Sequence, residues 1–99
     1  MNILKTKAEN TMTVALEGRL DTVTAPRLEA ELRTSVSGIE KLVLDLEKLD
    51  YISSSGLRVL LSAQKVMNRQ GEMIVCHVQP GIMEIFEVTG FSEMLHIEE

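Results

Sequence analysis

Apolar and polar residues follow two different periods along this chain, and the switch between them predicts its elements. Residues 12–16 alternate strictly, as in a strand with one buried face. Residues 3–4 form a shorter apolar run, and the polar stretch at 8–11 separates the two. The pattern therefore predicts an antiparallel hairpin at the N-terminus, followed by a loop over residues 18–24.

Three later stretches have the apolar spacing of amphipathic helices, with Thr22 or Thr24 as the cap of the first and glycines near each C-terminal end. The expected buried face of the first helix consists of Ala25, Leu28, Leu32 and Val36. That of the second consists of Leu57, Leu60, Leu61 and Met67, widened by Val59, Ala63 and Val66. That of the third consists of Ile82, Ile85, Phe86 and Thr89. We expect Gly38, Gly71 and Gly90 to end the helices, and Pro26 and Pro80 to lie in or just before a first turn.

Two nearly continuous apolar runs, 41–46 and 72–78, separate these helices and are typical of strands buried on both faces. Residues 47–50 are predicted to be a charged connector, after which Tyr51 and Ile52 return to the core. Alternating strands and helices favour parallel pairing. The chain is therefore predicted to be a single α/β domain over residues 1–99. Its sheet is mixed and mostly parallel, flanked by helices, with the antiparallel hairpin at one edge.

The serine turn, residues 53–56, lies between the apolar pair 51–52 and the second helix. Serine hydroxyls accept hydrogen bonds from the free N–H groups of a helix start, and the positive end of the helix stabilises an anion. A phosphate on Ser55 would be such an anion. Gly56 beside it would let a docking partner approach the backbone. The simpler interpretation is a polar turn with a helix cap.

The run DLEKLDYISSSGLRVLLSA resembles the central motif of the STAS domain, in the branch of bacterial anti-sigma-factor antagonists. Asp45 and Leu46 match its start, and residues 54–57 match its Ser-Ser-Gly-Leu. The segment GRLDTVTAPRLEAEL is similar to the family's Gly-x-Leu-Asp and the helix that follows it. Ser53 stands where the family usually has an acid.

The resemblance implies a protein that binds an anti-sigma factor while unphosphorylated and so frees a sigma factor. Phosphorylation of Ser55 by that partner, a serine kinase that brings its own ATP, would end the binding. Strand ends that meet helix starts form binding sites in such sheets, and the expected partner-binding residues are Asp21, Thr22, Ser53, Ser54, Gly56 and Arg58. The alternatives are a STAS subunit of a phospholipid transporter of the ABC type and a module of a stress-signalling complex, neither with phosphorylation.

The second helix leaves one narrow exposed strip, and its charged members are all basic: Arg58, Lys65 and Arg69, with Ser62 between them. Such a strip is either a solvated face or a contact for an acidic partner. The net charge of −5 argues against nonspecific binding to nucleic acid or anionic membrane. The chain also has no apolar run of about 20 residues. We expect a cytoplasmic monomer.

Catalytic and metal chemistry are not expected. A nucleophile elbow needs a glycine upstream of Ser55, where this chain has Ser53, and neither His77 nor His96 is predicted to act as a base. The motifs of an aspartate phosphoacceptor and of a phosphate-binding loop are also missing. Cys76 is predicted to be a small buried hydrophobe, and adjacent Cys76 and His77 would point to opposite faces of a strand. We therefore expect a binding module without cofactor or metal.

Overall fold

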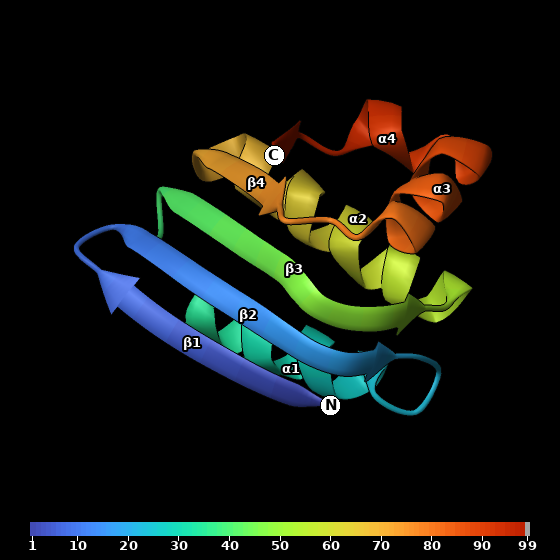
Figure 1. Cartoon of the computed structure of the whole chain (residues 1–99). Helices are drawn as coiled ribbons and strands as arrows, with labels where there is room; N and C mark the ends of the chain where they lie inside the picture. The colour runs from blue at the N-terminus through green and yellow to red at the C-terminus, as the bar shows by residue number, and fades with distance from the viewer. Residues whose placement is uncertain (99) are drawn as a thin grey trace.

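The structure is a computed structural model that describes residues 1–98, and within them it contains one five-stranded sheet and four helices (Figure 1). The elements are, in order, β1 (Asn2–Ala8), β2 (Thr11–Leu20), α1 (Ala25–Ser35), β3 (Lys41–Ile52), α2 (Ser54–Gln70), β4 (Glu72–Cys76), α3 (Pro80–Thr89), α4 (Phe91–Met94) and β5 (Ile97–Glu98). The predicted order of hairpin, helix, strand, helix, strand and helix is confirmed.

The strands follow one another across the sheet in the order β1-β2-β3-β4-β5. The pair β1–β2 is antiparallel, and the three other pairs are parallel. This confirms the predicted mixed sheet with an N-terminal hairpin. No helix in the described part of the chain is long and apolar enough to cross a membrane.

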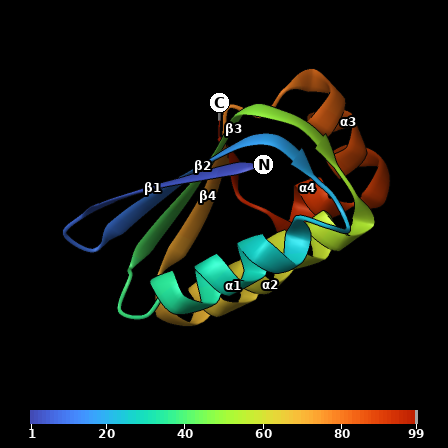
Figure 2. The ribbon, with the colours of Figure 1, turned by 90° about the horizontal axis from the view of Figure 1, so that it is seen from below.

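Helices α1 and α2 lie side by side over one face of the sheet (Figure 2). Their inner residues, such as Leu28 and Leu60, are fully buried against the strands. Helices α3 and α4 lie near the end of the sheet where β3 bends (Figures 1 and 2), and Phe86 of α3 is also fully buried. Gly90 ends α3 with a φ of 83°, a left-handed conformation that favours glycine, as predicted.

Strands β2 and β3 are longer than the pattern predicted. The loop expected from Gly18 begins only after Leu20, and the charged connector expected at 47–50 is part of β3. The reason is that β2 and β3 stay paired through two register shifts, which interrupt the alternation of each strand. Leu49, in the middle of the supposed connector, is fully buried.

The sheet has one buried face rather than two in β3. Leu42, Leu44 and Leu46 are fully buried below the helices, whereas Val43 and Asp45 on the other face remain partly exposed. The prediction of burial on both faces was therefore wrong for β3, whereas in β4 the consecutive residues Met73, Ile74 and Val75 are all buried. Tyr51 is also on the surface, where the Arg19 guanidinium lies 4.2 Å from its ring centre.

Other element ends also differ from the prediction. Helix α1 ends at Ser35 with Val36 as its C-cap, before the predicted Gly38. Val66 of α2, predicted to be buried, is exposed. Strand β4 stops at Cys76, so that His77 lies outside it with a φ of 55°. Cys76 itself is half-buried rather than fully buried.

Candidate functional site

The serine turn joins the end of β3 to the start of α2. Ser53 is the N-cap residue of α2, and its hydroxyl accepts a hydrogen bond from the Gly56 N–H at 3.3 Å. The Ser53 N–H donates to the Leu20 carbonyl at 2.9 Å, which ties the turn to the end of β2. The cap therefore comes from the residue that stands in place of the family's usual acid.

Ser55 lies in the first turn of α2, two residues after the cap, and is half-buried, whereas its neighbour Ser54 is exposed. Ser55 lines a cavity of about 420 Å³ together with Thr22 and Arg58. The loop after β2 and the first turn of α2 thus share one depression. The sequence placed both loops at helix starts, and the structure shows that they are neighbours.

The loop before α1 is organised by Asp21. Its carboxylate accepts hydrogen bonds at 3.0 Å from the N–H groups of both Val23 and Thr24. The Thr24 N–H is the main reason that the pKa of the Asp21 carboxyl lies below its usual value; the Thr24 hydroxyl, the Val23 N–H and the Arg19 charge lower it further, against the cost of desolvation.

Thr24 is the N-cap residue of α1, but its hydroxyl is used within the loop. It accepts from the Asp21 N–H at 2.9 Å and donates to the Arg19 carbonyl at 2.8 Å. Thr24 is thus the N-cap by position, as predicted, but it makes no side-chain cap hydrogen bond, and Thr22 lines the cavity beside Ser55. Asp21 thus shapes the loop that presents Thr22.

Gly56 has a role different from the one predicted. It is buried, and a Cβ added to it would lie 2.7 Å from Leu20 Cγ and 2.9 Å from Ile52 Cγ1. The space that this glycine leaves is filled by the protein's own core. Gly56 therefore allows α2 to pack closely on the ends of β2 and β3, and does not offer its backbone to a partner.

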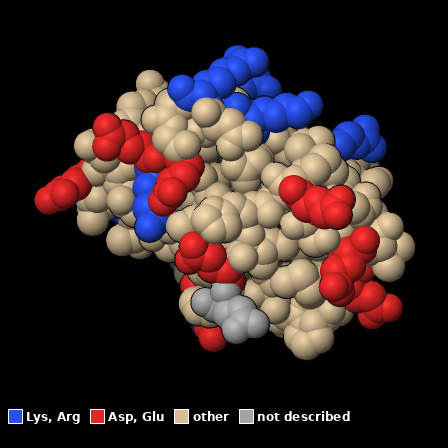
Figure 3. All heavy atoms as spheres, turned by 90° about the horizontal axis from the view of Figure 1, so that it is seen from above, with Lys and Arg blue, Asp and Glu red and all other residues tan. Residues whose placement is uncertain are grey.

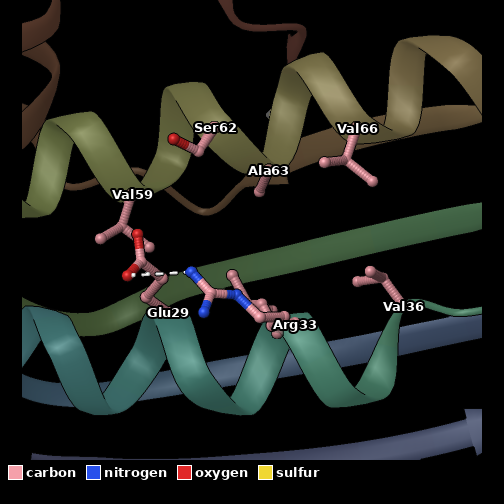
Figure 4. A pocket seen from close by; sticks show the side chains of 8 residues that line it. Glu29, Arg33, Val36, Val59, Ser62, Ala63 and Val66 are labelled. Carbon is pink, nitrogen blue, oxygen red and sulfur yellow. Dashed lines mark ion pairs between the residues drawn. The ribbon is translucent and has the colours of Figure 1, made fainter.

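A groove continues from the Ser55 cavity along the line between α1 and α2. Glu29, Val59 and Ser62 border both the Ser55 cavity and the next hollow, which is also lined by Leu32, Arg33, Val36, Ala63 and Val66. Figure 4 shows the side chains of the two helices facing each other across it, with the Glu29–Arg33 ion pair on the α1 side at 3.4 Å. The groove could not be predicted from the sequence, because the helical spacing of Val66 indicated a buried position.

Charges are separated over the surface. All charged residues of α2, namely Arg58, Lys65 and Arg69, are basic and exposed. After Arg69 the sequence has six glutamates and neither lysine nor arginine. Figure 3 shows one face, where most of the cations lie along one edge and the acids are spread over the remainder, with a smaller cationic group among them. The basic strip of α2 follows directly on Ser55 along the same helix.

Comparison with known sequences gives full-length matches. Residues 2–99 match the family model of the STAS domain. BtrV of Bordetella bronchiseptica, described as an anti-sigma factor antagonist, is 42% identical over 99 residues, which cover 98% of this chain and 85% of that protein. The anti-sigma-B factor antagonist of Staphylococcus aureus is 30% identical over 102 residues, covering 100% of this chain and 94% of its own.

Comparison with solved structures shows the same fold. An anti-sigma factor antagonist from Mycobacterium paratuberculosis superposes with a TM-score of 0.88 at 24% identity, over 97% of this chain and 83% of that one. The antagonist SpoIIAA, at 18% identity, gives 0.79 in its unphosphorylated form and 0.77 in its phosphorylated form. Both cover 99% of this chain, with 88% and 92% of the respective SpoIIAA chains.

Proposed function

This chain belongs to the STAS domain family, in the branch whose members are named anti-sigma-factor antagonists, and we propose that its unphosphorylated form binds an anti-sigma factor and thereby frees a sigma factor. Phosphorylation of Ser55 ends the binding. The protein contributes a surface and an acceptor hydroxyl, and it is not itself an enzyme. Because sigma factors work on RNA polymerase, this function places the protein in the cytoplasm.

One observation supports this assignment above the others: the cavity that Ser55 shares with Thr22 and Arg58. A hydroxyl in the first turn of a helix, at the edge of a depression formed by a second loop, lies where a partner would cover it. Ser54 is more exposed but does not line this cavity. We therefore assign the phosphate to Ser55, and we assign Ser53 to positioning of the turn through its cap.

The effect of the phosphate follows from its surroundings. It brings about −1.5 to −2 charges, which the N-terminal end of α2 and the Arg58 side chain stabilise in the free protein. A partner that covers the cavity must strip water from this dianion, or meet it with its own charges, and Glu29 on the same cavity adds to the negative charge. A penalty of about 2.8 kcal/mol weakens binding about a hundredfold.

The kinase activity comes from the partner in this proposal. The anti-sigma factor supplies ATP, its metal ion and the catalytic base, and the STAS protein supplies the Ser55 hydroxyl. The basic strip of α2 adjoins this hydroxyl, and it complements an acidic surface on the partner.

The test combines phosphorylation and binding. The protein is incubated with its cognate anti-sigma factor and ATP, and the serine peptide is analysed by mass spectrometry. We expect one phosphate on Ser55, its loss in Ser55→Ala, and its retention in Ser54→Ala, which is the matched control from the same turn. Labelling of Ser54, or equal labelling of Ser55→Ala, would contradict the assignment.

Binding of the same variants is measured by calorimetry with the anti-sigma factor. Ser55→Ala should bind like the natural protein, and Ser55→Asp should bind at least about tenfold more weakly, a loss of about 1.4 kcal/mol. If Ser55→Asp binds with unchanged affinity, charge at this position is not the switch. Recovery of an ATPase subunit of a transporter as the bound partner would favour the transport alternative instead.

A further inference from the structure

A cluster of a carboxylate, a thiol and an imidazole lies on the face of the sheet opposite to α1 and α2. Asp45 of β3, Cys76 at the end of β4 and His77 just after it bring a carboxylate oxygen, a sulfur and a ring nitrogen within 4.8 Å of one another. Asp45 and Cys76 are half-buried, and His77 is exposed. This cluster has no part in the function proposed above.

The backbone explains why these residues meet. Asp45 pairs with Cys76 in the parallel register of β3 and β4, and Cys76 pairs with Glu98 in that of β4 and β5. Residues paired in this way present their side chains on the same face of the sheet. His77 then leaves the strand with a φ of 55°, so the rule that neighbours in a strand point to opposite faces does not hold here. The expectation that Cys76 and His77 could not share a site was wrong for this reason.

We propose that Asp45, Cys76 and His77 bind a zinc ion. The three ligand types are those of known zinc sites, with bonds of about 2.3 Å to sulfur, about 2.0–2.1 Å to nitrogen and about 2.0–2.2 Å to oxygen. In a tetrahedron these bonds place sulfur about 3.6 Å, and oxygen about 3.3 Å, from the nitrogen. In the structure His77 Nδ1 lies 3.7 Å from Cys76 Sγ and 3.0 Å from Asp45 Oδ1. Two of the three ligand pairs are thus close to the required separations before any metal binds, and the third pair, sulfur and carboxylate oxygen, lies within 4.8 Å.

The surroundings of the cluster favour a cation. The Glu47 N–H donates to Asp45 Oδ1 at 3.1 Å and so fixes the carboxylate on its strand. In the register of the strands Cys76 lies between Asp45 and Glu98, so two carboxylates share its face of the sheet and attract a divalent ion. Binding of the ion would release the thiol proton. Lys48, further along β3, pairs with Glu17 at 3.6 Å.

The experiment is a titration of the reduced, metal-free full chain with Zn²⁺, followed by calorimetry, and with Co²⁺, followed by absorption. We expect one ion per chain and a thiolate-to-cobalt charge-transfer band. Cys76→Ser should abolish the band and weaken zinc binding at least about tenfold. About tenfold is the lower end of the loss in metal affinity found when a residue that supports a metal ligand is mutated. His77→Gly should do the same to zinc affinity, and glycine suits the positive φ at this position.

The matched control is His96→Ala, which removes the other histidine of the chain and its 3.3 Å contact with Glu98. It should bind zinc like the natural protein. The proposal is overturned if the natural protein binds no zinc, if Cys76→Ser or His77→Gly binds it equally well, or if two chains share one ion. Ser55→Ala should leave zinc binding unchanged, so the two sites can fail separately.

Discussion

Gly56 is buried because the first turn of α2 crosses closely over the ends of β2 and β3. A methyl group there would meet Leu20 Cγ and Ile52 Cγ1 at distances that real Cβ atoms do not show, and both of those side chains are themselves enclosed. We predict that Gly56→Ala lowers the free energy of unfolding by about 1–3 kcal/mol, the usual cost of overpacking a core. Urea denaturation monitored by circular dichroism measures the change.

Gly81 provides the control for this prediction. It lies in the first turn of α3, has no positive φ, and a Cβ added to it meets nothing within 4 Å among the described residues. Gly81→Ala should therefore be neutral or stabilising, by up to about 1 kcal/mol through helix propensity. If both variants lose the same stability, the cause is not the close packing at Gly56.

Ser53 shows how a departure from a family motif can keep the structure. Serine and aspartate are about equally good N-cap residues, because each places a side-chain oxygen where the first turn needs an acceptor. The hydrogen bond from the Gly56 N–H to the Ser53 hydroxyl is this contact. The substitution changes the charge beside Ser55 but leaves the first turn of α2 capped.

Among the elements, β3 shows best what the sequence could and could not predict. Its first half was found because Leu42, Leu44 and Leu46 form an obvious apolar run. Its second half was missed because the register shifts between β2 and β3 break the alternation, so that Leu49 stood alone among charges. Local periodicity cannot reveal a strand whose pairing is set by its neighbour.

The loop between β2 and α1 depends on one carboxylate, and this gives it a dependence on pH. The pKa of Asp21 is lower in the folded protein than in the unfolded chain, where it is about 3.9. The hydrogen bonds to Val23 and Thr24 therefore stabilise the fold fully above about pH 4, and this contribution is lost as the pH falls through the folded-state pKa.

We predict that Asp21→Ala is less stable than the natural protein at neutral pH, and that the difference shrinks as the pH falls below about 4. Thermal unfolding of both proteins across this range measures it. The control is Glu9→Ala, which removes an exposed acid outside this loop. Its thermal stability should differ from that of the natural protein by the same amount at every pH. A difference for Asp21→Ala that stays constant with pH would show that the carboxylate charge is not involved.

At the scale of the whole molecule, the topology could be predicted because strands that alternate with helices pair in parallel, and an initial hairpin leaves only one edge free for them. The candidate site was predicted in part. Helix starts indicated the Asp21 loop and the serine turn, but the groove between α1 and α2 and the cluster around Cys76 depend on packing and on the positive φ of His77. Neither leaves a periodic signal in the sequence.

The fold as a whole should not change when Ser55 is phosphorylated. The new charges lie on the N-terminal end of α2, where an anion stabilises a helix by about 0.3–1 kcal/mol. We predict that amide chemical shifts change only around the Asp21 loop, the end of β3 and the first turns of α2, and that unfolding free energy changes by less than about 1 kcal/mol.

The measurement is a pair of ¹⁵N-correlated NMR spectra, before and after phosphorylation, with Ser55→Asp as a stable mimic and Ser54→Asp as the matched control. Shifts that reach the β1–β2 turn, at the opposite end of β2 from the Asp21 loop, or the edge strand β5 would mean that the phosphate rearranges the domain. Loss of partner binding would then follow from a changed shape. If the shifts stay local while binding is lost, the partner must be sensing charge at the mouth of the Ser55 cavity.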